Sequence, residues 1–193
     1  MMQDIANFLY EVGMLQKTPR TGFQFLGSGR ESVAEHILRT IYIGYALAKL
    51  DPAADELKLL KMCLFHDLPE ARTGDMNYVN KKYVAVDESK AVRELTETLF
   101  FGADIAEAID EFNAKQTRES RLARDADQLA LILQLKEHGD LGNKYSQEWI
   151  RYALKRLCTD IGRRVAEGIL QTDSAHWWFK DKSDWWVNGH QEG

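Results

Sequence analysis

The sequence predicts an all-α bundle in a single domain over residues 1–193, and two observations support this prediction. Apolar residues recur at intervals of three and four along most of the chain, the spacing that places them on one face of a helix. No stretch alternates apolar and polar residues as a half-buried strand does, and no repeat period or domain linker is visible. The expected architecture is therefore a set of helices packed around one core.

Composition excludes several classes of protein. The chain has 193 residues, of which 45% are hydrophobic and 28% charged, as is ordinary for a globular domain. The formal net charge is -5 and there is no long basic run, so the chain lacks the positive surface of a nucleic-acid-binding protein. No apolar stretch is long enough to span a bilayer, and the N-terminus lacks the layout of a signal peptide. We therefore expect neither a nucleic-acid polymer nor a membrane as a partner.

The two cysteines, Cys63 and Cys158, each lie in an apolar helical context. Isolated cysteines in such positions are typical of reduced core residues rather than of a disulfide. We therefore predict two buried thiols and a cytoplasmic protein.

The N-terminal quarter of the chain predicts two helices joined by a loop. The first helix is expected over residues 2–16, where apolar residues keep helical spacing. Residues 17–31 contain one proline and three glycines, which predicts a loop. Ser32 and Glu35 have the spacing of a capping box, so the second helix is expected to begin at Ser32.

The middle of the chain predicts four more helices. One is expected over residues 54–68, and residues 69–85 are expected to be irregular, with a short helical turn around Tyr78. Two shorter helices follow, over residues 90–101 and around residues 105–112. Residues 118–137 are apolar around most of the helical circumference, which predicts the central helix of the bundle.

The C-terminal part predicts one long helix and an aromatic tail. Apolar residues keep helical spacing over residues 146–170. The tail, residues 172–193, contains four of the 5 tryptophans, namely Trp177, Trp178, Trp185 and Trp186. A tail this aromatic is expected to pack on the body of the protein or on a partner subunit.

An adjacent pair of polar residues ends the most apolar segment of the chain. Residues 59–65 leave almost no polar face, and His66 and Asp67 follow at once. Helical spacing places both side chains over apolar residues of the preceding turns, so we expect them to point inward. A buried carboxylate is costly unless a cation or several donors compensate it. A neutral imidazole beside a carboxylate suits a divalent metal ion.

Two other helices offer inward polar side chains for the same site. His36 projects near the edge of the buried face of the second helix, and the central helix offers Asp125 or Asp127. Helical geometry does not separate these two aspartates, and Asp125 lies closer to the apolar stripe. The structural alternative for His66 and Asp67 is a buried, hydrogen-bonded pair without a metal.

Five short motifs occur in an order that resembles a known family. They are Pro19-Arg20-Thr21-Gly22, Glu31-Ser32-Val33-Ala34-Glu35-His36, His66-Asp67-Leu68-Pro69-Glu70, Thr73-Gly74-Asp75 and Ala126-Asp127-Gln128-Leu129. Together they resemble the HD-domain metal-dependent phosphohydrolases, and within these the 5'-deoxynucleotidases. The resemblance covers roughly residues 15–135. It implies a helical bundle of the HD type that removes phosphate from (deoxy)nucleoside 5'-monophosphates.

The resemblance implies a metal site with four ligands. Carried over position by position, these are His36, His66, Asp67 and Asp127. The family pattern places the last ligand after a small residue and before a polar-Leu pair, which selects Asp127 over Asp125. Two imidazoles and two carboxylates suit one divalent ion such as Mn, Co, Fe, Ni or Zn.

Four further positions match residues that act on the water or on the substrate. Glu70 matches an acidic residue that orients or deprotonates the attacking water, and Asp75 matches a second one near the leaving oxygen. Arg20 matches an arginine whose guanidinium fork fits phosphate. In better-known members an aromatic residue follows this arginine directly and crowds the 2' position of the sugar. Here Thr21 follows and Phe23 is the first aromatic, so Phe23 is the expected substrate contact and the deoxyribose preference stays open.

The resemblance also implies a homodimer, because relatives are commonly dimers. Two other functions stay open, namely hydrolysis of another nucleotide, such as a triphosphate or signalling nucleotide, and non-catalytic binding of metal and nucleotide. The chain shows no large basic lobe for extra phosphates, which argues against the first alternative. Glu70 and Asp75 argue against the second, because a binding module does not need a water-activating carboxylate beside its metal.

Overall fold

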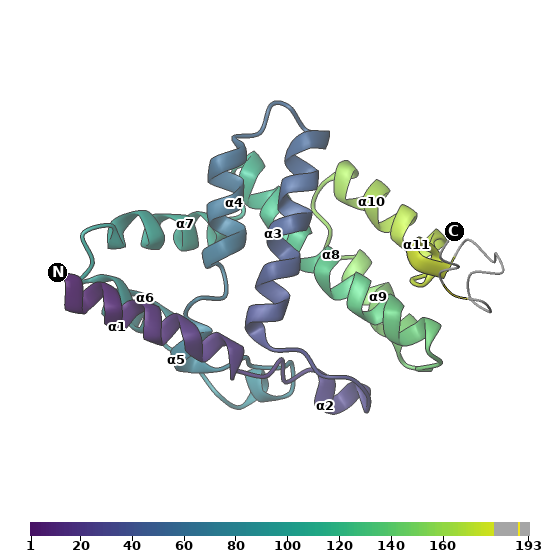
Figure 1. Ribbon diagram of the computed structural model, residues 1–193, viewed down its shortest axis with the longest axis horizontal. Coiled ribbons are helices and arrows are strands. Elements are labelled where there is room, and N and C mark those ends of the chain that lie inside the picture. The colour runs from purple at the N-terminus through teal and green to yellow at the C-terminus, as the bar shows by residue number, and fades with distance from the viewer. Residues whose placement is uncertain (180–188, 190–193) are drawn as a thin grey trace.

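The computed structural model of the protein describes residues 1–179 and residue 189 (Figure 1). In this part of the chain the regular structure is helical, apart from one isolated antiparallel bridge between Pro19 and Ser32. The all-α prediction is confirmed. Among the described helices, none combines the length and the apolar run that a bilayer crossing requires.

Three helices form the centre of the bundle. They are α3 (Val33–Leu50), α4 (Glu56–Phe65) and α8 (Arg118–Asp140), which pack against one another. In Figure 1, α3 and α4 stand side by side and α8 runs across them. The buried side chains between them include Leu47, Leu59 and Leu129. The prediction that residues 118–137 form the central helix is confirmed.

Hydrogen bonds at the helix starts explain where two of these helices begin. The predicted capping box is present, since the Glu35 N–H donates to the Ser32 hydroxyl and the Ser32 N–H donates to the Glu35 carboxylate. Asp55 caps α4, so this helix begins later than residue 54. It also ends earlier than predicted, which leaves His66 and Asp67 in the turn after the helix.

A second group of helices lies on the α4 side of the centre, around a separate apolar cluster. These elements are α1 (Met2–Val12), η1 (Gly13–Gln16), α6 (Glu88–Thr96) and α7 (Gly102–Ala114). The helix predicted over residues 2–16 is therefore α1 continued by a 3-10 turn. Val33 and Ile37 of α3 join this cluster, so α3 links the two parts of the core.

The prediction of one long helix over residues 146–170 is wrong. Two helices occupy this stretch, α9 (Ser146–Leu154) and α10 (Asp160–Gln171). Asp125 of α8 accepts the backbone N–H groups of Cys158 and Thr159, and the Thr159 side chain caps α10. These bonds satisfy donors that a continuous helix would have satisfied internally, so the chain turns over residues 155–159.

Short helices interrupt both segments that were predicted to be irregular. They are α2 (Phe23–Leu26), α5 (Glu70–Thr73) and η2 (Asn80–Lys82). Gly27 ends α2 with a φ of 77°, a left-handed conformation that glycine adopts without steric cost. Because each of these elements is about one turn long, the apolar periodicity of the sequence does not reveal it.

Two expectations for individual residues change. Cys63 is buried, but Cys158 is exposed in the turn before α10, so only one of the two predicted core thiols is in the core. The described part of the tail contains α11 (His176–Phe179), where Trp177 is 80% exposed rather than packed on the body. Trp185 and Trp186 lie outside the described residues.

Candidate metal centre and active site

His36 lies completely buried on α3, one turn after the capping box. Its Nε2 atom is 3.1 Å from Asp127 Oδ1 and 3.6 Å from Asp67 Oδ2. Its other ring nitrogen, Nδ1, is buried and has no hydrogen-bond partner. Burial lowers the pKa of His36, which favours the neutral imidazole that a metal ion requires.

His66 lies in the turn after α4 and is oriented by that helix. Its Nδ1 atom is 3.0 Å from the Cys63 carbonyl oxygen, so Nδ1–H donates to this oxygen and the lone pair of a neutral ring lies on Nε2. Nε2 is buried, makes no hydrogen bond with any described residue and lies 3.3 Å from Asp67 Oδ2. Two electron pairs facing each other at this distance require a proton or a cation between them. Burial acts to lower the pKa of His66, but Asp67 and Asp127 outweigh it and raise the pKa.

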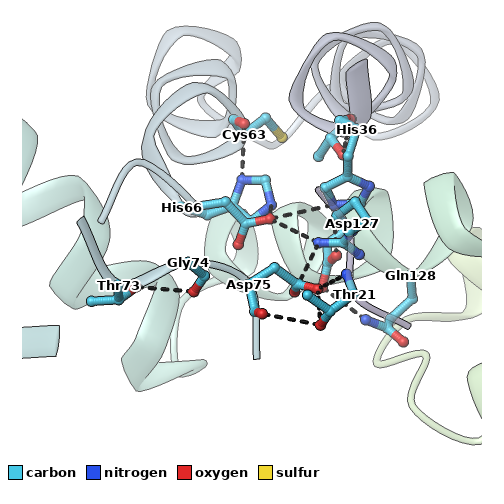
Figure 2. Close-up of polar contacts among 12 residues, drawn as sticks. Thr21, His36, Cys63, His66, Thr73, Gly74, Asp75, Asp127 and Gln128 are labelled. Atoms are coloured by element: carbon cyan, nitrogen blue, oxygen red, sulfur yellow. Dashed lines mark hydrogen bonds and ion pairs between the residues drawn. The ribbon is translucent and has the colours of Figure 1, made fainter. Parts of the chain in front are cut away.

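Asp67 and Asp127 supply negative charge to the same place. Figure 2 shows both histidine rings pointing from their helices toward Asp127, below which Gln128 lies. The Gln128 side-chain amide donates to Asp127 Oδ2 at 2.7 Å, and Arg20 donates to Asp67 Oδ2 at 3.1 Å. Burial acts to raise the pKa of each aspartate, but the neighbouring histidines and Arg20 outweigh it and hold both pKa values far below their usual range.

These side chains fit a divalent metal ion. Ligand atoms that are about 2.1 Å from one ion, at right or tetrahedral angles, lie about 3 to 3.4 Å from one another. Within the described residues, ligand atoms of His36, His66 and Asp67 all lie within 4.8 Å of one another, and Asp127 Oδ1 is 3.1 Å from His36 Nε2. The unpartnered Nε2 of His66 and the two ionised carboxylates, as they stand in the described residues, match what such an ion requires.

Asp125 does not belong to this group. Its carboxylate faces away from the histidines and accepts from Cys158 N–H at 2.6 Å and from Thr159 N–H at 2.9 Å. The Thr159 hydroxyl donates to it as well, at 2.6 Å. The structure therefore separates the two aspartates that helical spacing left open, because only Asp127 lies beside His36.

Glu70 is the first residue of α5, immediately after the turn that carries the His-Asp pair. One of its carboxylate oxygens, Oε2, is buried without a hydrogen-bond partner. Burial, and then the charges of Asp67 and Asp75, raise the pKa of Glu70 to about 9. A buried carboxylate with a free oxygen beside a metal centre has the properties of a group that exchanges a proton with a bound water.

Asp75 and Arg20 join the loop before α3 to the segment after α5. The backbone N–H of Thr21 donates to Asp75 Oδ2 at 2.6 Å, and the Thr21 hydroxyl donates to the same oxygen at 2.9 Å. Arg20 Nη1 lies 3.9 Å from Asp75 Oδ1 and 3.1 Å from Asp67 Oδ2. Thr21 therefore holds the Asp75 carboxylate in place.

One cavity of about 350 Å³ collects most of the predicted residues. Six of the eight line it, namely Arg20, Phe23, Asp67, Glu70, Asp75 and Asp127, while His36 and His66 lie buried behind them. The charged groups gather at one end. Phe23, Leu131, Leu135 and Trp149 also line the cavity and belong to one apolar cluster, with Leu135 about two turns beyond Asp127 on α8. A cavity with charged side chains and an apolar cluster suits a small organic anion.

Sequence reasoning missed several residues of this cavity. Arg124, Leu131 and Leu135 follow the helical spacing of Asp127 along α8, and Gln128 follows the spacing of Arg124, so their positions were available from the periodicity. Trp149 comes from α9 and lies against Gly22, where an added Cβ would be 3.6 Å from its ring. No local signal in the sequence brings these two segments together.

The fold and the site define a helical metal-dependent hydrolase, and comparisons with known proteins identify the family. A family model described as "HD domain" matches residues 12–169. The chain therefore belongs to the HD domain family, and the resemblance found in the sequence is confirmed.

Named relatives and solved structures agree with this assignment. The chain is 31% identical to 5'-deoxynucleotidase HDDC2 of Dictyostelium discoideum over 71% of this chain and 78% of the relative. It is 28% identical to 5'-deoxynucleotidase HDDC2 of Bos taurus over 74% of this chain and 71% of the relative. A conserved hypothetical protein from Pyrococcus furiosus matches with a TM-score of 0.75 at 28% identity, over 86% of this chain and 99% of that one.

Proposed function

We propose that this protein is a divalent-metal-dependent phosphohydrolase that removes phosphate from deoxynucleoside 5'-monophosphates. One observation carries the proposal: two imidazoles and two carboxylates, from α3, the turn after α4 and α8, meet at ligand distances beside a cavity that Glu70 also lines. The substrate class comes from the relatives named 5'-deoxynucleotidase. The apolar cluster of the cavity supports it, because a nucleotide has a charged phosphate at one end and a flat base at the other.

His36, His66, Asp67 and Asp127 would hold the metal ion. When bound, the ion supplies a Lewis acid that lowers the pKa of a water and polarises a phosphoryl oxygen. Glu70 accepts the proton of the attacking water, since its free oxygen lies beside the ligands. Glu70 would be ionised, as a base must be, once the charge of a bound ion lowered its pKa again.

Asp75 and Arg20 act on the substrate side of the site. Two donors from Thr21 fix the Asp75 carboxylate, so it is positioned to contact the sugar or the leaving oxygen. Arg20 uses one nitrogen for Asp67 and keeps other donors for a phosphoryl oxygen. Phe23 is the proposed sugar or base contact, and its ring is packed edge-on against His138, 5.6 Å between ring centroids.

The finer features of the enzyme are also proposals. We infer one ion for each site, drawn from Mn, Co, Fe, Ni and Zn, since two nitrogens and two oxygens suit all of these. We infer a cytoplasmic homodimer, the assembly that the family resemblance implies. Light scattering that gives a single 22.2 kDa species would contradict the dimer.

A substrate screen tests the proposal. Metal-free protein is reloaded with each of the five metals and incubated with deoxyribo- and ribonucleoside monophosphates and with triphosphates, and released phosphate is measured. The expected result is metal-dependent release from deoxynucleoside monophosphates and at least about a hundredfold less with the His66→Ala variant. Preferential cleavage of triphosphates would show that nucleoside triphosphates, rather than monophosphates, are the substrate class. Tight nucleotide binding without release would instead indicate a non-catalytic module.

A further inference from the structure

Four cationic side chains line the cavity, and most of them already have partners. They are Arg20, Lys81, Arg124 and Arg156. Arg20 is shared between Asp67 and Asp75. Arg156 donates to the Gln128 side-chain oxygen and lies over the Tyr78 ring. Lys81 is exposed on η2, where water solvates its charge.

Arg124 differs from the other arginines of the cavity. Its guanidinium lies over the ring of Phe112, 4.8 Å from the ring centroid, and within the described part of the chain it makes no ion pair or hydrogen bond with a side chain. The residue is only partly exposed, so its charge is not fully solvated. A partly buried cation without an anionic partner is costly, which indicates that an anion from outside the chain completes this site.

The position of Arg124 places its charge next to the metal centre. It precedes Asp127 by one turn of α8, a rise of about 4.5 Å along the helix axis. The Phe112 ring that supports it also contacts His66, with 4.9 Å between ring centroids. A guanidinium that stacks on an aromatic face keeps its N–H groups at the edge, where they can donate to an anion.

The carboxylates of the site do not neutralise the charge of Arg124. Asp67, Glu70, Asp75 and Asp127 line the same cavity, yet no ion pair joins any of them to Arg124 in the described residues, whereas Arg20 lies within reach of two. A metal ion would take up the charge of Asp67 and Asp127. A phosphomonoester dianion would then meet one arginine whose charge is already shared and one whose charge is available.

We propose that Arg124 binds the phosphate group of the substrate and is the principal source of positive charge for it apart from the metal. This inference rests on the proposed function. It assigns Arg20 chiefly to holding Asp67 and Asp75, with a secondary contact to phosphate. The alternative is that Arg124 only covers Phe112, in which case its charge would not affect the affinity for phosphate.

Binding of inorganic phosphate to the metal-loaded protein tests the proposal without requiring turnover. Isothermal titration calorimetry compares the wild type with Arg124→Gln, Arg124→Lys and Arg121→Gln. Arg121 is the matched control, because it lies one turn earlier on the same helix and is exposed outside the cavity. The expected result is a loss of phosphate affinity of about tenfold to a hundredfold for Arg124→Gln, a smaller loss for Arg124→Lys and no change for Arg121→Gln.

The outcomes are distinguishable from a failure of the proposed function. Metal content and circular dichroism establish that each variant is folded and loaded. If loaded Arg124→Gln binds phosphate as tightly as the wild type, or the wild type binds none, the inference is overturned. If Arg124→Gln does not fold, Arg124→Lys decides: a partial loss of phosphate affinity supports the proposal, and wild-type affinity contradicts it. If phosphate affinity falls as expected but no nucleotide is hydrolysed, the phosphate site at Arg124 is supported and the proposed substrate class is wrong.

Discussion

Asp125 and Asp127 lie two residues apart on α8, and the carboxylates of both are inside the protein, but they perform different tasks. Asp125 accepts two backbone N–H groups and one hydroxyl from the turn before α10, and so fixes the path of the chain. Asp127 lies beside the His36 ring and accepts the Gln128 amide. Neutral donors bind the first carboxylate, whereas the second lies at ligand distance from a titratable ring.

The pKa values express the same difference. Burial raises the pKa of Asp125, and the three donors from Cys158 and Thr159 do not cancel this effect. Burial also acts to raise the pKa of Asp127, but His36, His66 and Arg20 outweigh it and hold the pKa far below its usual range. Hydrogen bonds satisfy the lone pairs of a buried carboxylate, while positive charge compensates its charge. A candidate metal ligand is therefore recognised by charged neighbours rather than by burial alone.

The largest expected effect comes from removing the charge of Asp127. In Asp127→Asn the amide keeps the size of the side chain but loses the negative charge that faces His36. We expect phosphate release to fall by more than about a hundredfold, since even residues that only orient a metal ligand cost about 10- to 100-fold. Metal content measured after dialysis should fall in parallel. A variant with full metal content and full activity would show that Asp127 is not a metal ligand.

A glycine of α10 tests the Asp125 side of the comparison. A Cβ added at Gly162 would lie 2.3 Å from Asp125 Oδ2, so Gly162→Ala has to displace the carboxylate or the helix. We expect the free energy of unfolding to fall by about 3 kcal/mol. Gly168→Ala on the same helix is the control, because nothing lies within 4 Å of its added Cβ, and it should be neutral or stabilising by up to about 1 kcal/mol. Equal stability of the two variants in urea denaturation would contradict the close packing of Gly162 against Asp125.

These two sites also show how far the sequence determines the structure. Apolar spacing predicts that α8 is central and that His66 and Asp67 point inward, because both follow from helical geometry. The break between α9 and α10 was missed, since apolar spacing continues through it and the bonds that cause it come from Asp125, more than 30 residues earlier. Long-range hydrogen bonds of this kind leave no local pattern.

The same limit applies to the candidate site. Motif order identifies the residues that the structure brings together, including Asp127 rather than Asp125. The partners of those residues were not predictable in the same way. Arg20 lies against Asp67, and Trp149 lies against Gly22, because separate segments meet only when the bundle has formed.

Removal of the Asp125 charge should affect stability more than catalysis. In Asp125→Asn, the amide oxygen still accepts one of the two backbone N–H groups, from Cys158 or Thr159, while the amide NH2 group faces the other. We expect a loss of about 2 kcal/mol in the free energy of unfolding, the cost of leaving a buried donor unsatisfied. At a temperature where the variant is folded, kcat should stay within about threefold of the wild type. A loss of activity as large as that of Asp127→Asn would contradict the claim that Asp125 acts on stability and Asp127 on catalysis.

The smallest expected effect concerns the support of Asp127. Arg156 donates to the Gln128 oxygen, and the Gln128 amide donates to Asp127, so the guanidinium orients the carboxylate through one intermediate. We expect Arg156→Ala to weaken metal binding by about tenfold, as loss of such support does in other metal sites. Arg156→Lys should restore part of the affinity. Competition with a metal-binding dye measures both variants, and wild-type affinity in Arg156→Ala would show that Gln128 needs no such support.

The central claim is that His36, His66, Asp67 and Asp127 bind one divalent ion, and X-ray absorption spectroscopy of the cobalt-loaded protein tests it most directly. The spectrum should show two imidazole ligands and oxygen ligands at about 2.0–2.2 Å. The imidazole contribution should fall to one ring in His36→Ala, while His138→Ala, a histidine outside the ligand group, should leave it unchanged. A wild-type spectrum with oxygen ligands alone, or with sulfur, would contradict the claim.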